Sequence, residues 1–403
     1  MPQQCAHGWI RTPEERSNMA QQRNKSFPAD LVGSRVQELQ EYAPEPLAET
    51  ARRLGMPVGS LIKADANENP YGPTARALRV LREFDQYHRY PDPISRRLAE
   101  RIGDYVGVPD GHILVGNGSD ELIDLILRLF RPDAEGNGIS EVIDCPPTFG
   151  MYAFYGATND MRVVEIPRDA SYAVDIDYIT ALCARDPRPR VLFAASPNNP
   201  DGQLLSCDVL ERLLALPLLV VLDEAYIEFA GTSRASWVPR YDNLIVLRTF
   251  SKWAGLAGLR VGYGVLPLSL MPALLKLKSP YNVNGAAQAA ALATLEDVDA
   301  ALERVRDIVR DRDMLYEKLA CIPGVQAYPS QANYIMCRLE HGTLDALTAY
   351  MEVRGILLRY YGRGGLERCV RISVGTPEQN ETIAKAMEAF AATSSGDKQV
   401  GGS

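Results

Sequence analysis

Short apolar runs alternate along the chain with longer segments in which apolar residues recur at the helical period. The runs are rich in branched residues and cover 112–115, 141–145, 163–166, 191–194, 218–222, 244–247 and 261–265. The helical segments between and after them include 119–131, 206–216 and 271–278. This alternation predicts an α/β domain in which helices cover both faces of a mostly parallel, seven-stranded sheet.

A long segment of helical period, 285–319, ends before Pro323 and predicts a helix that runs from one domain to the next. After it we expect a smaller α+β domain, with strands at 325–337, 355–359 and 370–374 and helices at 343–354 and 377–390. The predicted organisation is a disordered leader 1–26, an N-terminal segment 27–69 that packs with the small domain, a large domain 70–284 that binds the cofactor, a small domain 285–393 and a disordered tail 394–403.

Composition narrows the classes of protein. The chain has 403 residues, with 43 Lys and Arg against 51 Asp and Glu, so its net charge of −8 disfavours unspecific binding to nucleic acid. The apolar segment 213–222 contains Pro217 and is far shorter than the roughly 20 residues of a membrane helix. Seven scattered cysteines without a C-x-x-C and four histidines indicate neither a disulfide framework nor a metal site. We expect a cytoplasmic protein that binds no metal, no nucleic acid and no membrane.

A glycine-containing turn follows the strand that ends at Val115. Residues 116–121 read Gly-Asn-Gly-Ser-Asp-Glu and lead into an amphipathic helix. Glycines let the backbone approach an anion, and the first amides of the helix supply donors, so the turn is a candidate phosphate site. A plain glycine turn before a helix explains the same residues. The dinucleotide fingerprint is not met, because Glu121 stands at its last glycine.

Asparagine and aspartate follow two further strands. Residues 196–202 read Ser-Pro-Asn-Asn-Pro-Asp-Gly, and the prolines can fix a turn that aims an amide into the crevice at the end of the strand. A rigid loop with Asx-turns is the alternative. Asp223 ends an apolar interior strand, where a carboxylate loses hydration unless a cation lies beside it. A helix cap is the other reading of Asp223.

A lysine follows the next strand in the segment Thr249-Phe250-Ser251-Lys252. In a crevice among apolar and glycine residues Lys252 would lose hydration, and its neutral amine would become a nucleophile that can form a Schiff base. An isolated lysine is usually a surface charge. Here, however, the glycine turn, the Asn loop, the Asp and the Lys all follow strands of one predicted sheet, at the edge where α/β proteins bind ligands.

Pyridoxal phosphate is the cofactor that uses all four features. Asp223 would keep its ring nitrogen protonated, Asn199 and Tyr226 would bond its phenolic oxygen, and Lys252 would hold its aldehyde and afterwards move a proton. Phe149 would cover the ring face. The phosphate would be held by Ser119, Ser251 and Arg260, and the expected cofactor-binding set also includes Gly118, Asp120 and Thr249.

From about residue 42 to residue 390 the sequence resembles the fold-type I pyridoxal-phosphate-dependent aminotransferases, and among them most closely the histidinol-phosphate aminotransferases. The motifs that carry the resemblance lie at 67–72, 88–93, 116–121, 145–152, 196–202, 223–229, 249–263 and 370–376. The sharpest is Ser251-Lys252 followed by Gly-Leu-Ala-Gly-Leu-Arg at 255–260. Several motifs in the family's order are far more specific than any one of them.

The resemblance implies roles for single residues. Lys252 would be the Schiff-base lysine, with Asp223 and Tyr226 as the other catalytic residues. In a homodimer, Tyr90 would reach the cofactor phosphate of the partner subunit. Substrate binding would fall to Tyr42, Asn69, Arg359 and Arg371. The chain departs from the family at Phe149, where Tyr is frequent, and at Asp201, where Thr is usual.

The implied reaction moves an amino group between L-histidinol phosphate and 2-oxoglutarate, giving imidazole-acetol phosphate and L-glutamate in histidine biosynthesis. An aromatic amino acid aminotransferase is one alternative, because Phe149 and an apolar pocket would accept a ring without a phosphate. A phospho-amino-acid decarboxylase on the same scaffold is another. A cofactor-sensing transcription regulator would need a DNA-binding domain in front, and the residues before Tyr42 carry no helix-turn-helix pattern.

Overall fold

The computed structural model describes residues 32–33, 36–37, 39, 45–362 and 364–396. Residues 1–44 and 45–403 form two separate units, and the sheets and the site described below lie in the second. The predicted leader 1–26 and Tyr42 lie outside the described residues. The division of the chain into segments at 27, 70, 285 and 394 stays a prediction.

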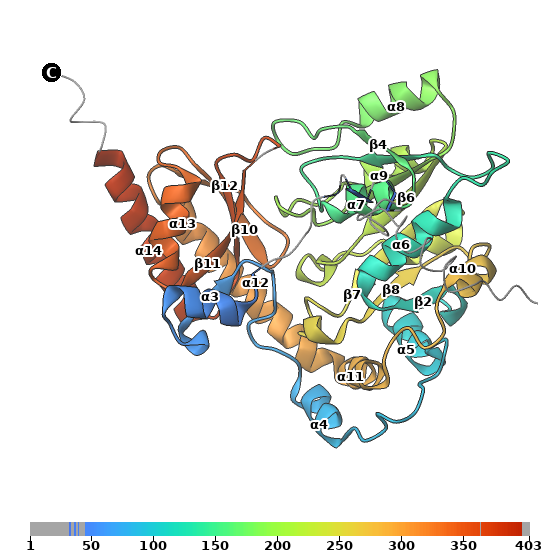
Figure 1. Ribbon diagram of the computed structural model, residues 1–403, viewed down its shortest axis with the longest axis horizontal. Coiled ribbons are helices and arrows are strands. Elements are labelled where there is room, and N and C mark those ends of the chain that lie inside the picture. Colours follow the sequence, from blue (N-terminus) through green and yellow to red (C-terminus); the bar gives the residue numbers. More distant parts are fainter. Residues whose placement is uncertain (1–31, 34–35, 38, 40–44, 363, 397–403) are drawn as a thin grey trace, which may run out of the picture. The chain divides into compact units, whose positions relative to one another are not determined.

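Within the described residues the larger sheet has seven strands in the order β2-β8-β7-β6-β5-β3-β4 (Figure 1). They are β2 (Ile113–Gly116), β3 (Glu141–Asp144), β4 (Arg162–Glu165), β5 (Arg190–Ala195), β6 (Leu218–Asp223), β7 (Leu244–Thr249) and β8 (Gly262–Val265). The strands from β7 to β4 pair in parallel. Because β8 is antiparallel to both β7 and β2, β2 runs in the common direction. The mostly parallel, seven-stranded sheet is therefore confirmed.

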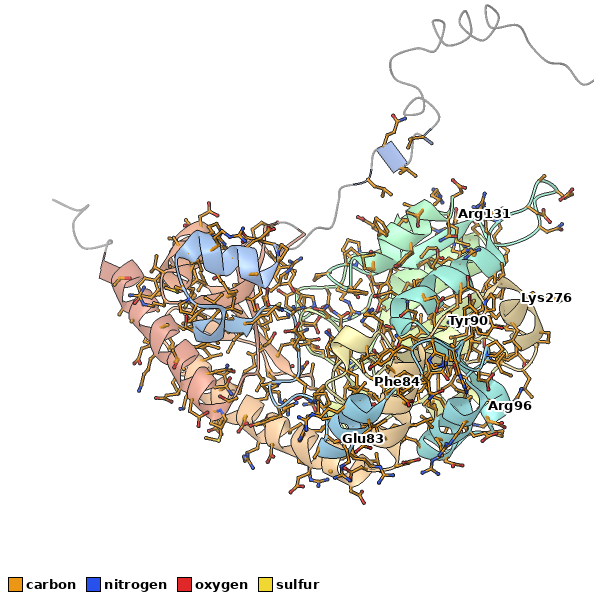
Figure 2. All side chains as sticks on the ribbon, turned by 60° about the horizontal axis from the view of Figure 1, so that its bottom comes forward. Glu83, Phe84, Tyr90, Arg96, Arg131 and Lys276 are labelled. Atoms are coloured by element: carbon orange, nitrogen blue, oxygen red, sulfur yellow. The ribbon has the colours of Figure 1, made fainter. Side chains whose placement is uncertain are left out.

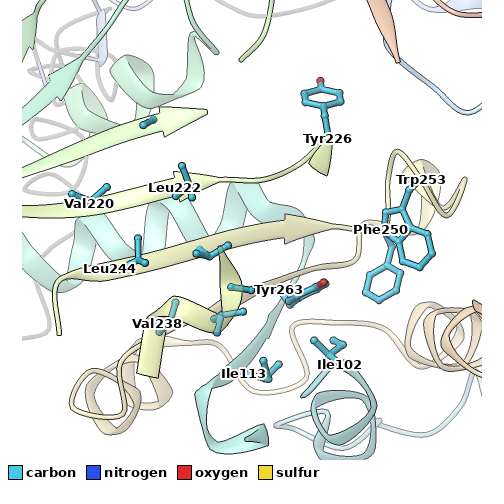
Figure 3. Packing of buried hydrophobic residues seen from close by; sticks show 14 of the residues in the cluster. Ile102, Ile113, Val220, Leu222, Tyr226, Val238, Leu244, Phe250, Trp253 and Tyr263 are labelled. Carbon is cyan, nitrogen blue, oxygen red and sulfur yellow. The ribbon is translucent and has the colours of Figure 1, made fainter. Parts of the chain in front are cut away.

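Helices cover both faces of this sheet. Successive residues of a strand point to opposite faces, so each strand contributes to two apolar cores. On β6, Val220 and Leu222 belong to one apolar core, and Leu219 and Val221 belong to another. Figure 3 shows part of the first core, with Val220 and Leu222 on β6 and Leu244 on β7. The helices of the first core are α5 (Arg96–Val106), α8 (Ile176–Arg185), α9 (Cys207–Leu214) and α11 (Gly285–Leu295), and those of the second are α6 (Gly118–Phe130), α7 (Met151–Thr158) and α10 (Met271–Leu277).

The segment 285–319 does not form one helix as predicted. Helix α11 ends at Leu295, and Asp297 has φ −130° and ψ 40°, which interrupts the helix before α12 (Val298–Ala320). Helix α12 nevertheless connects the two cores: Val305 packs in the core of the large sheet, and Leu319 packs in the core of the smaller sheet. Helix α4 (Ala75–Glu83) packs against α11.

A smaller sheet has the order β1-β11-β12-β10-β9. Its strands are β1 (Ile62–Ala64), β9 (Val325–Ala327), β10 (Tyr334–Leu339), β11 (Ile356–Tyr361) and β12 (Cys369–Ser373), and the nearby helices are α3 (Leu47–Leu54), α13 (Leu344–Glu352) and α14 (Pro377–Gly396). The strand predicted at 325–337 is two strands, because Pro329 cannot donate to a ladder and Ser330 Oγ accepts from the amide of Ala332 in a turn. Strand β1 was missed because it is three residues long.

The described helices include none that is long and apolar enough to cross a membrane.

Candidate active site

A cavity of about 280 Å³ lies at the edge of the large sheet where β5, β6 and β7 end. These three strands are parallel, so the loops that follow them meet at one edge. Strand β8 runs the opposite way, which brings the residues just before it, including Arg260, to the same edge. The predicted residues that line the cavity are Ser119, Asp120, Phe149, Asn199, Asp223, Tyr226, Thr249, Ser251, Lys252 and Arg260.

Hydroxyl groups and a guanidinium gather at one end of this cavity. The Nη1 of Arg260 donates to Ser251 Oγ at 3.3 Å, and its Nη2 donates to Asp120 Oδ2 at 3.0 Å. Thr249 Oγ1 donates to Ser251 Oγ at 3.0 Å and accepts from the amide of Ser251 at 3.1 Å. Hydroxyls, a guanidinium and the amides that open α6 are the donors that a phosphate needs.

Two glycines keep this end of the cavity open. A Cβ on Gly262 would lie 2.5 Å from the amide nitrogen of Ser119 and 2.7 Å from the carbonyl carbon of Gly118, both in the backbone. Gly118 itself has φ +79°, and a Cβ there would lie 2.5 Å from Arg260 Nη2. The turn 116–121 can therefore lie against β8 and Arg260 only because both positions lack a side chain.

The carboxylate of Glu121 also stabilises the turn 116–121. It accepts from the amide of Asn117 at 2.6 Å and from Asn282 Nδ2 at 2.6 Å. Lys278 Nζ in turn donates to Asn282 Oδ1 at 2.7 Å and to the carbonyl of Pro93 at 2.7 Å. Glu121, which stands at the last glycine position of the dinucleotide fingerprint, is thus connected through Asn282 and Lys278 to the segment that carries Tyr90. Nothing in the sequence pattern pointed to Lys278 or Asn282.

Asp223 is buried at the carboxyl end of β6. Its Oδ2 accepts from the hydroxyl of Tyr152 at 2.7 Å, and its Oδ1 accepts from the amide of Ala225 at 3.0 Å. Burial raises the pKa of Asp223 to about 6, against the lowering effect of these two hydrogen bonds. Asp223 is therefore a carboxylate that gains from a cationic neighbour.

Lys252 lies on the cavity wall after β7, and its Nζ donates to the carbonyl of Ala66 at 3.0 Å. Burial, and after it the positive charge of Arg371, lower the pKa of Lys252 to about 8, while Glu68 opposes the shift. About a tenth of Lys252 is thus the neutral amine at pH 7, far more than for an ordinary lysine. A nucleophilic amine and a proton carrier both need this form.

Tyr226 and a bonded pair, Asn199 and Arg371, lie near Lys252. The ring of Tyr226 lies 5.8 Å from Lys252 Nζ, and its hydroxyl accepts from Asn67 Nδ2 at 3.0 Å. Arg371 is buried on β12, and its Nη1 donates to Asn199 Oδ1 at 2.5 Å while its Nη2 donates to the carbonyl of Asp65 at 2.6 Å. The buried Nε of Arg371 has no hydrogen-bond partner among the described residues. Arg371 therefore has one donor, on Nε, that no described residue uses.

Asp201, the second residue at which the chain departs from the family pattern, forms hydrogen bonds within its own turn. Asp201 is fully buried, and its carboxylate accepts from the amide of Gln203 at 2.8 Å and from the side-chain amide of Asn198. Asn198 also accepts from Thr148 Oγ1 at 2.7 Å. Asp201 therefore closes the turn that carries Asn199 and does not line the cavity.

Five of the predicted residues that the structure describes do not line the cavity: Gly118 and Arg371, described above, and Asn69, Arg359 and Tyr90. Asn69 donates from Nδ2 to the carbonyl of Trp253 at 2.9 Å and so holds two loops together. Arg359 lies on β11 directly across from Arg371 of β12. Tyr90, labelled in Figure 2, is 82% exposed on the segment between α4 and α5. Its ring stacks on that of Tyr281, with centroids 4.5 Å apart. Tyr42 lies outside the described residues.

Sequence reasoning missed Asn67 and Tyr152, although both lie inside motifs that it used. Asn67 has φ 54° in the left-handed region that Asn tolerates, and its side chain bonds Tyr226 and Ser373. Tyr152 bonds Asp223 from α7. The motifs could be seen in the sequence, but the partners lie 71 to 306 residues away and only the fold joins them.

These residues fit pyridoxal phosphate. The open cradle at Gly118 and Gly262 with Arg260 suits its phosphate, the buried carboxylate of Asp223 suits a protonated ring nitrogen, and the neutral amine of Lys252 suits its aldehyde. Phe149 lines the cavity and can cover a planar ring. When bound, the cofactor supplies an electron-accepting ring that stabilises negative charge on the substrate carbon bonded to nitrogen.

Comparison with known proteins agrees with this site. Residues 60–387 match the model of the family described as aminotransferase class I and II. The chain is 46% identical over 378 residues to the histidinol-phosphate aminotransferase of Roseiflexus castenholzii, covering 91% of this chain and 100% of that protein. It is similar to the structure of histidinol-phosphate aminotransferase from Sinorhizobium meliloti in complex with pyridoxal-5'-phosphate, with TM-score 0.79, 26% identity and coverage of 90% and 98% of the two chains.

A decarboxylase shares the fold as well. The L-threonine-O-3-phosphate decarboxylase of Porphyromonas gingivalis is 26% identical with TM-score 0.69, and the likeness covers 82% of this chain and 99% of that one. The family match and the relative at 46% identity nevertheless decide the class: the chain belongs to the class I and II aminotransferases. Within that class it is a member of the histidinol-phosphate aminotransferase family. The resemblance, the α/β fold and pyridoxal phosphate as the cofactor are confirmed.

Proposed function

We propose that this protein moves an amino group between L-histidinol phosphate and 2-oxoglutarate, giving imidazole-acetol phosphate and L-glutamate in histidine biosynthesis. The proposal rests on the family membership and on one observation, the buried guanidinium of Arg371. It is bonded to Asn199 on the cavity wall, and its Nε has no hydrogen-bond partner in the part of the chain that the structure describes. One substrate carries a phosphate and the other carboxylates, and a forked guanidinium binds either.

We assign the following roles to the chain's own residues. Ser119, Ser251 and Arg260 anchor the phosphate of the cofactor, with Gly118, Asp120 and Thr249 around them. Asp223 keeps the ring nitrogen protonated, Asn199 and Tyr226 bond the phenolic oxygen, and Phe149 covers the ring. Lys252 would take a proton from the substrate carbon bonded to nitrogen and return it to the carbon on the other side of that nitrogen, for which an amine with a pKa of about 8 is suited. Arg371 and Arg359 orient the substrate anion, and Tyr42 and Asn69 contribute to the substrate pocket.

We also propose a homodimer in which Tyr90 completes the phosphate site of the partner. Two of the most exposed large aromatic side chains, Tyr87 and Tyr90, lie on the same segment, and an isologous dimer would cover both copies of it. The segment itself is fixed, since Asp92 accepts from the amides of Ile94 and Arg96 at 3.1 and 3.0 Å. A cytoplasmic location completes the proposal, and cell fractionation tests it.

An assay with a panel of amino donors and 2-oxoglutarate tests the proposed reaction. We expect L-histidinol phosphate to give the largest kcat/KM, with glutamate formed in step with its consumption. A larger kcat/KM with phenylalanine or tyrosine would assign the protein to the aromatic amino acids instead. The decarboxylase is a second candidate because of the fold it shares with the Porphyromonas gingivalis enzyme. Release of CO2 from a phospho-amino acid without any keto-acid exchange would favour it.

A further inference from the structure

Tyr152 is a buried aromatic residue near the start of α7 that connects two parts of the cavity. Its side chain has no exposed surface. Its ring stacks on Phe193 of β5, with centroids 4.8 Å apart and an interplanar angle of 8°, and meets Phe149 edge-on at 5.5 Å. Its hydroxyl donates to Asp223 Oδ2 at 2.7 Å. Two aromatic contacts thus fix the ring so that the hydroxyl points at one carboxylate oxygen.

We propose that Tyr152 is a positioning residue that acts through Asp223 and keeps the proton on the ring nitrogen of bound pyridoxal phosphate. The inference rests on the proposed role of Asp223. A proton between a carboxylate and a pyridine nitrogen stays on the nitrogen only while the carboxylate is the weaker base. A donor to the carboxylate stabilises its anion and so weakens it as a base. Tyr152 is the side chain that donates to Asp223 in the described residues.

The surroundings keep Tyr152 in the donor form. Burial holds the pKa of Tyr152 well above its ordinary value, and the charges of Asp223 and Asp144 act in the same direction. Asp223 feels the negative charge of Asp120, which raises its pKa, and the positive charge of Lys252, which lowers it. Without the Tyr152 hydroxyl, the amide of Ala225 is the remaining donor to Asp223 that the structure describes. Asp223 would then become a stronger base in a buried site.

Tyr152→Phe removes the hydroxyl and keeps the ring that packs on Phe193 and Phe149. Tyr263→Phe is the matched control, because Tyr263 is also fully buried and its hydroxyl has no hydrogen-bond partner in the described part of the chain. Both variants lose one buried hydroxyl from the large domain, so a general effect on packing would appear in both. An effect through Asp223 would appear only in Tyr152→Phe.

The test is 15N NMR of the holoenzyme loaded with cofactor labelled at its ring nitrogen, recorded across pH. While the pair holds one proton, we expect the resonance of Tyr152→Phe to lie nearer the unprotonated position than that of the wild type, because the proton moves from the ring nitrogen toward Asp223. The Tyr263→Phe spectrum should match the wild type. We expect kcat to fall roughly tenfold while KM for 2-oxoglutarate changes little. A Tyr152→Phe titration that coincides with the wild type would overturn the proposal.

Two further variants separate the possible causes of failure. Asp223→Asn should itself deprotonate the ring nitrogen; if it does not, the role of Asp223 is wrong and Tyr152 has nothing to act through. If Tyr152→Phe does not fold, 3-fluorotyrosine at position 152 keeps the shape and donates a stronger hydrogen bond. Its 15N resonance should lie nearer the protonated position than that of the wild type, and a resonance nearer the unprotonated position would contradict the proposal.

Discussion

The cavity at the sheet edge and the segment that carries Tyr90 differ in how far one chain completes them. In the cavity, Asp223 and Lys252 are held by hydrogen bonds within the chain, and burial shifts the pKa of each. On the segment between α4 and α5, Tyr87 is 73% exposed and Tyr90 82%. The side chains of the cavity are therefore held within one chain, whereas the segment leaves large aromatic side chains exposed.

The segment is nevertheless as well fixed as the cavity. Tyr90 stacks on Tyr281, Lys278 donates to the carbonyl of Pro93, and Asp92 bonds two amides that follow it. Rigid backbone beneath an exposed aromatic side chain suits a residue that must reach a defined place on a partner. In the homodimer that we propose, Tyr90 would complete the site of the partner, and we expect variants of the two regions to behave differently.

The largest effect should come from Lys252→Ala, which removes the amine from the cavity. We expect transamination to fall by at least about a thousandfold, because the proton carrier is lost. Lys276→Ala, an exposed lysine on α10, should leave activity unchanged. Borohydride reduction of the wild-type holoenzyme and peptide mapping should place the pyridoxyl group on Lys252. A pyridoxyl group on Lys276 or Lys278 would show that the cavity has been assigned to the wrong lysine.

Arg371→Ala should weaken both half-reactions. Each substrate loses a charge-assisted contact, so kcat/KM should fall roughly 10- to 150-fold with L-histidinol phosphate and with 2-oxoglutarate. We expect Arg359→Ala to harm the phosphorylated donor more than 2-oxoglutarate. The exposed Arg368, which lies next to β12, gives the control variant Arg368→Ala. Unchanged kinetics of Arg371→Ala with both substrates would remove Arg371 from the site.

The smallest effect should be a shift with pH. The pKa of Lys252 is lowered to about 8, so the neutral fraction rises with pH, and the rate at which the apoenzyme takes up pyridoxal phosphate should rise with a midpoint near this value. The charge of Glu68 raises the pKa of Lys252. Glu68→Gln should therefore move the midpoint to lower pH, and Glu388→Gln, exposed on α14, should not move it. A midpoint that rises in Glu68→Gln would contradict the assignment to Lys252.

The cavity was predictable because its side chains follow strands of one parallel sheet. Asp223, Lys252 and Asn199 could be grouped from that pattern, since parallel strands end at one edge. Tyr152, Asn67 and the Lys278 network could not be grouped this way, because their partners are distant in sequence and depend on how α7, β12 and the loops pack.

The smaller sheet was the less predictable part of the fold. Local periodicity showed β11 and β12, but β1 is three residues long and gains its place only by pairing in parallel with Ile356, Leu357 and Leu358. The interruption at Asp297 between α11 and α12 likewise has no nearby proline or glycine from which it could be predicted. Tertiary packing decided these elements, and short-range pattern was too weak to show them.

The most direct test of a site divided between two chains is a mixed dimer of two inactive variants. Lys252→Ala keeps Tyr90, and Tyr90→Asp keeps Lys252. If Tyr90 serves the partner, the site of the Tyr90→Asp subunit in a mixed dimer combines its own Lys252 with an intact Tyr90. After random exchange of equal amounts, about a quarter of the wild-type activity should return. If Tyr90 serves its own subunit, every site lacks the lysine or the tyrosine, and the mixture should stay inactive.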